Sequence, residues 1–208
     1  MKKIDITTWK RKQHFEFFST FDEPYFGVTF TVNVTKAKEI AKTQGVSLFA
    51  YYLHKSLVAA SSIENFCYRI TPDNNVVQYP NMGTSCTIMR ANETFAFSDV
   101  TYSDDVKIFA QQLQAEIDRI QQCEDLFPPT QSPNVMHCSA IPWLDFTSVT
   151  HSRLFSERDG TPKMSYGKIT FKEGLYTMPV AVYVHHGLVD GLHVSRFSEL
   201  FQSLLDGA

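Results

Sequence analysis

The sequence predicts a single α/β domain over residues 1–208, with a mixed β-sheet and helices packed against one of its faces. Three observations lead to this prediction. Short segments in which apolar and polar residues alternate, as in half-buried strands, recur along the chain. Segments with apolar residues at helical spacing lie between them. No internal repeat or linker divides the chain, so we expect one core.

The N-terminal half predicts two helices among several strands. Residues 25–33 alternate apolar with small or polar side chains and predict a strand. A helix is expected over residues 36–43, capped by Thr35 and ended by Gly45. Helical spacing predicts a second helix over residues 48–61. Further strands are expected at residues 65–70, 76–79, 84–90 and 94–101, the last two as a hairpin.

The C-terminal half continues this alternation. Ser103-Asp104-Asp105 predicts the start of a long helix whose apolar face runs as far as Cys123. Further strands are expected at residues 135–140, 166–172 and 175–186. The chain ends in an amphipathic helix, with Phe197, Leu200, Phe201 and Leu204 on the inward face.

Composition excludes several classes of function. The net charge is -3 and no stripe of Lys or Arg interrupts the balance, so a nucleic-acid partner is not expected. Because no apolar run is long enough for a membrane span or a secretory signal, we expect a cytoplasmic protein without a membrane partner. The four scattered cysteines are expected to be small buried hydrophobes, not disulfides or a zinc site. The 17 phenylalanines and nine tyrosines fill the core or line an apolar pocket.

The most informative stretch is an apolar strand that runs into His185 and His186 and then into a glycine-containing loop around Asp190. Rigid scaffolds present catalytic groups on loops at strand ends. A neutral imidazole can take a proton from a hydroxyl near neutral pH. Asp190 can fold back and fix the shape of the loop, provided that it finds a cationic partner.

Local physics leaves three interpretations of the two histidines. A catalytic base and a hydrogen-bonded structural residue are equally compatible with the pattern. A metal site that adds Asp190 and His193 ranks third. Adjacent residues on a strand point to opposite faces, so His185 and His186 rarely share one ion.

The pattern His185-His186-x-x-x-Asp190-Gly191-x-His193 resembles the signature of the chloramphenicol acetyltransferase family. Other blocks resemble the same family, in the same order along the chain. They are residues 9–18, Glu93-Thr94-Phe95, Leu126-Phe127-Pro128, residues 139–143 and the segment from Pro162 to Lys168. The resemblance therefore extends over nearly the whole sequence.

The resemblance implies a role for each matching residue. His186 corresponds to the general base of the family. Arg11 and Asp190 correspond to a buried ion pair that holds the catalytic loop without touching substrate. Ser139 corresponds to the hydroxyl that hydrogen-bonds the tetrahedral oxyanion. Ser165 stands where the family usually has a threonine that holds a water near the same charge.

The resemblance also implies a reaction and an assembly. Acetyl would pass directly from acetyl-CoA to a hydroxyl of chloramphenicol, or of a similar small acceptor, in a ternary complex without a metal. The family fold is a two-layer α/β sandwich that assembles as a homotrimer with active sites at subunit interfaces. A covalent route through Cys138 carries little weight, because Cys138 and Ser139 are strand neighbours and face opposite ways.

The resemblance also extends to the ligand pockets, and it gives some of the 17 phenylalanines a role besides packing in the core. Positions similar to those lining the acceptor pocket are Phe18, Phe26, Phe95, Phe127 and His151. Trp143 and Lys168 fall near the coenzyme A tunnel, where Lys168 would meet a phosphate unless it is a solvated surface lysine.

The sequence departs from the family pattern in the expected acceptor pocket. Phe18 lacks the hydroxyl of the tyrosine often found there, and His151 stands where an apolar residue is usual. Three further departures lie around the histidine motif: Tyr183 replaces a usual glutamine, Gly187 a usual serine or alanine, and Leu192 a usual aromatic residue. The reaction class is therefore better determined than the acceptor. Two alternatives remain: an acyltransferase of the same fold acting on another alcohol, amine or thiol, and a trimer that binds drugs without catalysis.

Overall fold

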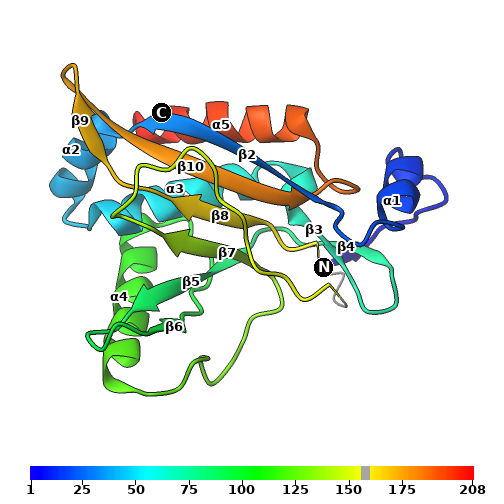
Figure 1. Ribbon diagram of the computed structural model, residues 1–208, viewed down its shortest axis with the longest axis horizontal. Helices are drawn as coiled ribbons and strands as arrows, with labels where there is room; N and C mark the ends of the chain where they lie inside the picture. Colours follow the sequence, from blue (N-terminus) through cyan, green and yellow to red (C-terminus); the bar gives the residue numbers. More distant parts are fainter. Residues whose placement is uncertain (156–159) are drawn as a thin grey trace.

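The computed structural model describes residues 1–155 and 160–208, and its centre is a mixed sheet of seven strands (Figure 1). In spatial order these are β2 (Tyr25–Asn33), β10 (Leu175–His185), β8 (Lys163–Tyr166), β7 (Val135–Ala140), β5 (Gly83–Met89) and β6 (Phe95–Phe97), while β9 (Thr170–Lys172) pairs with β10. Strands β5, β7 and β8 run parallel to one another, and the other pairs are antiparallel. The sheet is therefore of the mixed type that the sequence predicts.

Helices cover one face of this sheet, as expected. They are α2 (Thr35–Gln44), α3 (Leu48–Ser61), α4 (Val106–Gln122) and α5 (Gly191–Leu205), and a short helix α1 (Lys12–Phe18) lies beside the end of β10 (Figure 1). Val180, Val182 and Val184 of β10 face the helices and are at most 1% exposed. Phe197 and Phe201 of α5 are fully buried in the same core. The predicted fold class is confirmed. Among the described helices, none combines the length and apolar character needed to span a membrane.

A smaller sheet lies beside the main one. It consists of β1 (Lys2–Lys3), β4 (Val76–Gln78) and β3 (Tyr68–Ile70), and β3 follows the 3₁₀-helix η1 (Glu64–Cys67). The strand expected at residues 65–70 is therefore confirmed only for residues 68–70, because residues 65–67 belong to η1.

The opposite face of the main sheet carries a row of small hydroxyl side chains. Thr87, Ser139, Ser165 and Ala181 are consecutive partners across β5, β7, β8 and β10. Because paired strand residues point to the same face, the three hydroxyls share the face away from the helices. The segment that follows β7 crosses this face (Figure 1).

Other elements match the predicted ranges closely. The strands expected at residues 25–33 and 135–140 and the helix expected at 48–61 have those bounds. The long helix begins at Val106, and its N-cap Asp105 accepts from Lys107 N at 2.7 Å through its side chain. The final helix buries the predicted apolar side. The hairpin of β5 and β6 is shorter than expected, since Ser98 interrupts the ladder by binding Cys86 N through its hydroxyl.

Two local predictions are wrong. Thr35 does not cap α2: it is the first helical residue, and its hydroxyl accepts from Tyr176 N at 2.9 Å. The strand expected at residues 166–172 is two strands, β8 and β9, which part at Gly167. There Lys168 N donates to Leu144 O, and a Cβ on Gly167 would lie 2.8 Å from that same oxygen. The crossing segment therefore requires glycine and separates the strands.

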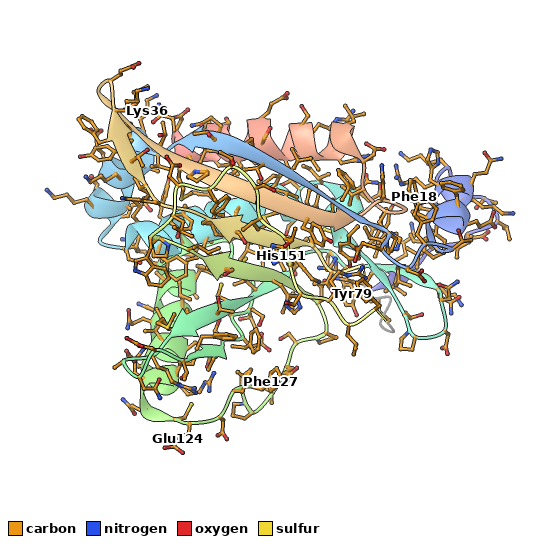
Figure 2. All side chains as sticks on the ribbon, viewed as in Figure 1. Phe18, Lys36, Tyr79, Glu124, Phe127 and His151 are labelled. Atoms are coloured by element: carbon orange, nitrogen blue, oxygen red, sulfur yellow. The ribbon has the colours of Figure 1, made fainter. Side chains whose placement is uncertain are left out.

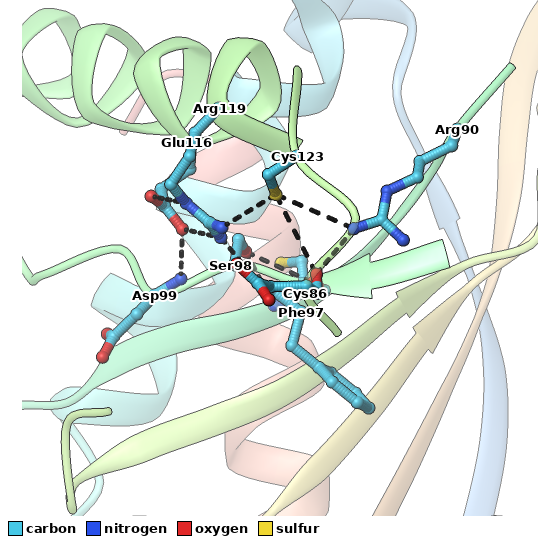
Figure 3. Close-up of polar contacts among 9 residues, drawn as sticks. Cys86, Arg90, Phe97, Ser98, Asp99, Glu116, Arg119 and Cys123 are labelled. Carbon is cyan, nitrogen blue, oxygen red and sulfur yellow. Dashed lines mark hydrogen bonds and ion pairs between the residues drawn. The ribbon is translucent and has the colours of Figure 1, made fainter. Parts of the chain in front are cut away.

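A polar network around Arg119 fixes the β5–β6 hairpin to α4 (Figure 3). Arg119 Nη2 donates to Phe97 O at 3.0 Å, and Arg119 Nε lies 2.8 Å from Glu116 Oε1. Glu116 Oε2 in turn accepts from Asp99 N. Burial raises the pKa of Glu116, but the hydrogen bonds from Arg119 and Asp99 outweigh it and leave the pKa below its ordinary value. The network therefore positions the backbone around Phe97.

We predict that Arg119→Leu lowers the free energy of unfolding by ~1–3 kcal/mol, because Glu116 and Phe97 O both lose a charged donor. Urea unfolding measures this. The matched control is Lys107→Leu, since Lys107 is exposed on the same helix; it should change stability by less than ~0.5 kcal/mol. Equal stability of the two variants would contradict the structural role of the network.

Candidate active site

His186 emerges from the end of β10 into an aromatic environment. Its backbone N–H donates to Pro24 O at 2.8 Å, which extends the pairing of β10 with β2 by one bond. The imidazole stacks on Phe18 of α1, with 4.3 Å between ring centroids and 17° between ring planes. Phe26 of β2 packs on it at 4.4 Å. The ring is therefore held between two phenylalanines from separate elements.

The hydrogen bonding of His186 assigns its tautomer. Nδ1 lies 3.2 Å from Val189 O, and a carbonyl oxygen only accepts, so Nδ1 carries the proton in the neutral ring. Nε2 is then the basic nitrogen with a lone pair. A neutral imidazole with its lone pair on Nε2 can accept the proton of a hydroxyl that approaches this nitrogen.

Arg11 holds the loop that carries His186. Its Nη1 lies 2.8 Å from Asp190 Oδ2, its Nε donates to Gly187 O at 3.1 Å, and its Nη2 donates to His186 O at 3.1 Å. Arg11 is only 6% exposed. One buried guanidinium thus satisfies three acceptors in the five residues from His186 to Asp190. It is the cationic partner that the sequence requires for Asp190.

Asp190 has a second structural role as the N-cap of α5. Its Oδ1 accepts from Leu192 N at 3.1 Å, and the His193 ring accepts from Asp190 N in return, which completes a capping box. Burial raises the pKa of Asp190, but the hydrogen bond with Arg11 and the charges of His193 and Arg11 outweigh it, so the pKa lies below its ordinary value.

The metal interpretation of the two histidines receives no support from their surroundings. His185 is 1% exposed, packs edge-on against Tyr25 and accepts from Gly187 N through Nδ1 at 3.0 Å. His193 belongs to the capping box. Within residues 1–155 and 160–208, no group of three or more His, Cys, Asp or Glu side chains is arranged to hold a metal ion.

Ser139 lies on the helix-free face of the sheet, in the row of hydroxyls. Its Oγ accepts from Thr87 Oγ1 at 3.4 Å. Its strand neighbour Cys138 lies on the opposite side, in the core beside Cys86, and burial raises its pKa well above the ordinary range. The expected opposite orientation of Cys138 and Ser139 is confirmed. Ser165, on the next strand, is 1% exposed, and its Oγ lies 3.3 Å from His151 Nε2.

Ser139 and His186 are far apart within one chain. Two strand spacings of ~4.8 Å separate Ser139 from Ala181, its in-register neighbour on β10. His186 lies five residues beyond Ala181, or ~16 Å along the strand direction. The two groups are therefore on the order of 20 Å apart. In a single chain they cannot contact the same reacting carbonyl.

The aromatic residues predicted for the acceptor pocket also form two separate groups, as Ser139 and His186 do. Phe18 and Phe26 lie beside His186, whereas Phe127 stacks on Phe97 at 5.2 Å and Phe95 packs edge-on against Phe97. Figure 2 shows Phe18 and Phe127 in separate parts of the molecule, with His151 over the sheet between them. The predicted site residues of the described chain thus form two separate groups, one around His186 and one around Ser139. We name them, after their predicted roles, the base half-site and the oxyanion half-site.

The oxyanion half-site borders a cavity of about 160 Å³. Its walls include Phe97 and Phe127, and its floor includes Ser85 and His137, which are in-register neighbours two residues before Thr87 and Ser139. Sequence reasoning missed Thr87 and Phe97. The signal for Phe97 was its position two residues after Phe95 on one strand, which places both rings on the same face.

Trp143 and Lys168 lie at the carboxyl ends of β7 and β8. The bond from Lys168 N to Leu144 O joins their two segments. Trp143 is 64% exposed, and Lys168 is exposed as well. Their predicted contact with coenzyme A stays a prediction. The structure brings their two segments together beyond the carboxyl ends of β7 and β8, next to Ala140.

Solved structures define the class of protein to which this arrangement belongs. A chloramphenicol acetyltransferase structure matches with a TM-score of 0.88 and 34% identity, over 98% of this chain and 99% of that one. The catalytic core of a 2-oxoacid dehydrogenase multienzyme complex from Thermoplasma acidophilum matches with a TM-score of 0.71 at 11% identity, over 97% and 98%. The second likeness shows the fold alone. The class is an acyltransferase built on this sheet.

Sequence comparisons narrow the class to a family. The model of the chloramphenicol acetyltransferase family matches residues 1–202. A chloramphenicol acetyltransferase of Bacillus pumilus is 27% identical, over 99% of this chain and 93% of the relative. One from Staphylococcus aureus is 25% identical, over 97% of both. The chain belongs to the chloramphenicol acetyltransferase family.

The lowered pKa of Asp190 makes its contribution to stability depend on pH. A carboxyl whose folded pKa lies below its unfolded value stabilises the fold above the unfolded pKa, and this contribution is lost as the pH falls through the folded pKa. We predict that Asp190→Asn is less stable than wild type by ~1–3 kcal/mol at pH 7, below the ~3–5 kcal/mol of a fully buried pair because the Asp190 side chain is 35% exposed. The difference should shrink below pH ~4.

Urea unfolding at several pH values tests this prediction. Asp73→Asn is the control, because Asp73 is exposed in the turn between β3 and β4; its stability should follow wild type throughout. A difference for Asp190→Asn that stayed constant from pH 7 to pH 3 would refute the ion-pair origin of the effect.

Proposed function

We propose that the protein transfers acetyl from acetyl-CoA to a hydroxyl of chloramphenicol, which inactivates the antibiotic. The observation that carries the proposal is the contact of His186 Nδ1 with Val189 O at 3.2 Å, which leaves Nε2 as the nitrogen with a lone pair when the ring is neutral. Membership in the chloramphenicol acetyltransferase family over residues 1–202 supports the choice of substrates.

In the proposed reaction, His186 Nε2 takes the proton of the acceptor hydroxyl as its oxygen attacks the thioester carbonyl carbon. The carbonyl oxygen becomes an oxyanion and accepts a hydrogen bond from Ser139 Oγ. Collapse of the tetrahedral intermediate breaks the carbon–sulfur bond, and the departing thiolate takes the proton from the imidazolium. A general base contributes roughly 10²–10⁴-fold and one oxyanion donor roughly 10²–10³-fold to such a rate.

The separation of the half-sites supports shared active sites between protomers. Ser139 and His186 lie on the order of 20 Å apart along one sheet, so one carbonyl reaches both only if a second chain supplies one of them. We propose a homotrimer in which the base half-site of each protomer faces the oxyanion half-site of its neighbour. A closed ring of three such interfaces gives every His186 a Ser139.

The proposed pocket combines the aromatic rings of the two half-sites. Phe18 and Phe26 from one protomer and Phe95 and Phe127 from the next would enclose an apolar acceptor. Trp143 and Lys168 would approach the coenzyme. An acceptor other than chloramphenicol, and drug binding without turnover, are the two competing outcomes that the following assay separates.

We predict that His186→Ala lowers kcat with acetyl-CoA and chloramphenicol by roughly 10²–10⁴-fold, and Ser139→Ala by roughly 10²–10³-fold. Thiol release measures the rate, and fluorescence titration measures chloramphenicol binding. The control is His14→Ala, because His14 is exposed on α1; its rate should equal that of wild type.

Three other results would each overturn a part of this proposal. Thiol release only with other alcohols, amines or thiols would replace the acceptor. Chloramphenicol binding without thiol release would replace catalysis with capture. Unchanged turnover of His186→Ala would remove the base.

Shared sites predict complementation between inactive variants. Co-refolding His186→Ala with Ser139→Ala should restore activity, because about a quarter of the sites in a random mixture pair an intact His186 with an intact Ser139. The control replaces the first partner by the double variant, which supplies neither group and should restore nothing. An inactive mixture with mixed trimers detected by mass spectrometry would show that each site lies within one chain.

A further inference from the structure

A second histidine lies on the oxyanion half-site. His151 belongs to the segment that crosses the helix-free face of the sheet, and its Nε2 is 3.3 Å from Ser165 Oγ. Its ring also packs against Tyr183 of β10, with 5.6 Å between centroids. Ser165 is only 1% exposed. The imidazole therefore covers the hydroxyl that the family resemblance associates with a bound water.

Ser165 is the last hydroxyl of the row across the sheet. Thr87 Oγ1 donates to Ser139 Oγ at 3.4 Å, and Ser139 and Ser165 are in-register partners on parallel strands. Their side chains share the helix-free face, roughly one strand spacing of ~4.8 Å apart. A serine hydroxyl rotates freely unless a neighbour fixes it. In this row, the neighbour of Ser165 on the side of the crossing segment is the His151 ring.

The His151 ring is neutral under the conditions in which such an enzyme works. Burial lowers the pKa of His151 to about 4, and the charge of Lys163 on β8 acts in the same direction. A neutral imidazole has one N–H donor and one lone pair. If Nε2 carries the hydrogen, the ring donates to Ser165 Oγ, and the serine proton is then directed elsewhere.

We propose that His151 is a positioning residue of the oxyanion half-site: its Nε2–H donates to Ser165 Oγ and turns the Ser165 hydroxyl proton toward the carbonyl oxygen bound beside Ser139. This proposal rests on the acetyl transfer proposed above. It gives the two rings opposite tautomers, with the proton on Nε2 in His151 and on Nδ1 in the neutral form of His186. His151 itself touches neither substrate nor coenzyme in this role.

A double-mutant cycle tests the coupling of His151 to Ser165. His151→Leu should lower kcat about fivefold to tenfold, the worth of one hydrogen bond, with the KM for acetyl-CoA within twofold of wild type. His151→Gln keeps an N–H donor and should recover most of the rate. In a Ser165→Ala background, His151→Leu should cost nothing further, because the hydroxyl it orients is gone.

Several outcomes of this cycle would overturn the inference. A raised KM for chloramphenicol with unchanged kcat would make His151 a wall of the acceptor pocket. A full loss in the Ser165→Ala background would make its effect independent of Ser165. A rate of His151→Gln as low as that of His151→Leu would remove the donor role. Wild-type protein that fails to acetylate chloramphenicol would defeat the proposed function instead.

A second measurement needs no acceptor. Nitrogen-15 NMR of histidine-labelled protein at pH 7, assigned with the His151→Leu and His186→Ala variants, reports which ring nitrogen carries the proton. We expect Nε2–H for His151 and Nδ1–H for His186. An Nδ1–H tautomer, or a protonated ring, for His151 would overturn the inference even if chloramphenicol is a substrate.

Discussion

The interaction on which the site depends is the buried guanidinium of Arg11. It binds two carbonyl oxygens of the turn, His186 O and Gly187 O, and the carboxylate of Asp190. A tight turn leaves carbonyls without partners, and a buried orphan acceptor is costly. Because Arg11 satisfies them, the turn can close and Val189 O can reach Nδ1 of His186. Arg11 thus fixes the shape of the turn that carries His186.

The second constraint is the alternation of strand side chains. On β7, it places Cys138 in the core and Ser139 on the helix-free face, so one strand contributes both to the core and to the hydroxyl row. Helices cover the other face, and among the described residues the segment that follows β7 crosses the face with the hydroxyl row. The same sheet also separates Ser139 from His186 by two strand spacings and by the stretch of chain from Ala181 to His186. In the proposed trimer, a partner protomer would bring a second copy of the oxyanion half-site opposite the base half-site of the first.

The sequence predicted much of this fold, because strong periodicity identifies elements that bury one face. The ranges of β2, α3 and β7 followed from alternation and helical spacing alone. Predictions failed where a distant contact overrides a local signal. Thr35 is engaged by Tyr176 N instead of capping α2, and Gly167 breaks a continuous strand pattern because the crossing segment approaches its backbone. The pairing of Arg11 with Asp190 was expected only through the family resemblance, since 179 positions separate the two residues.

By itself the sequence determined the chemical groups and their local setting: a histidine pair at a strand end, a loop aspartate, a strand serine beside a core cysteine, and the α/β class. Those properties depend on residues close together along the chain. Tertiary structure alone decided which nitrogen of His186 contacts Val189 O and how far Ser139 lies from His186. It also decided that Phe18 lies beside His186 while Phe127 stacks on Phe97, and that His151 covers Ser165. Each of these depends on contacts between distant segments, whose geometry is set by packing and hydrogen bonding across the whole sheet.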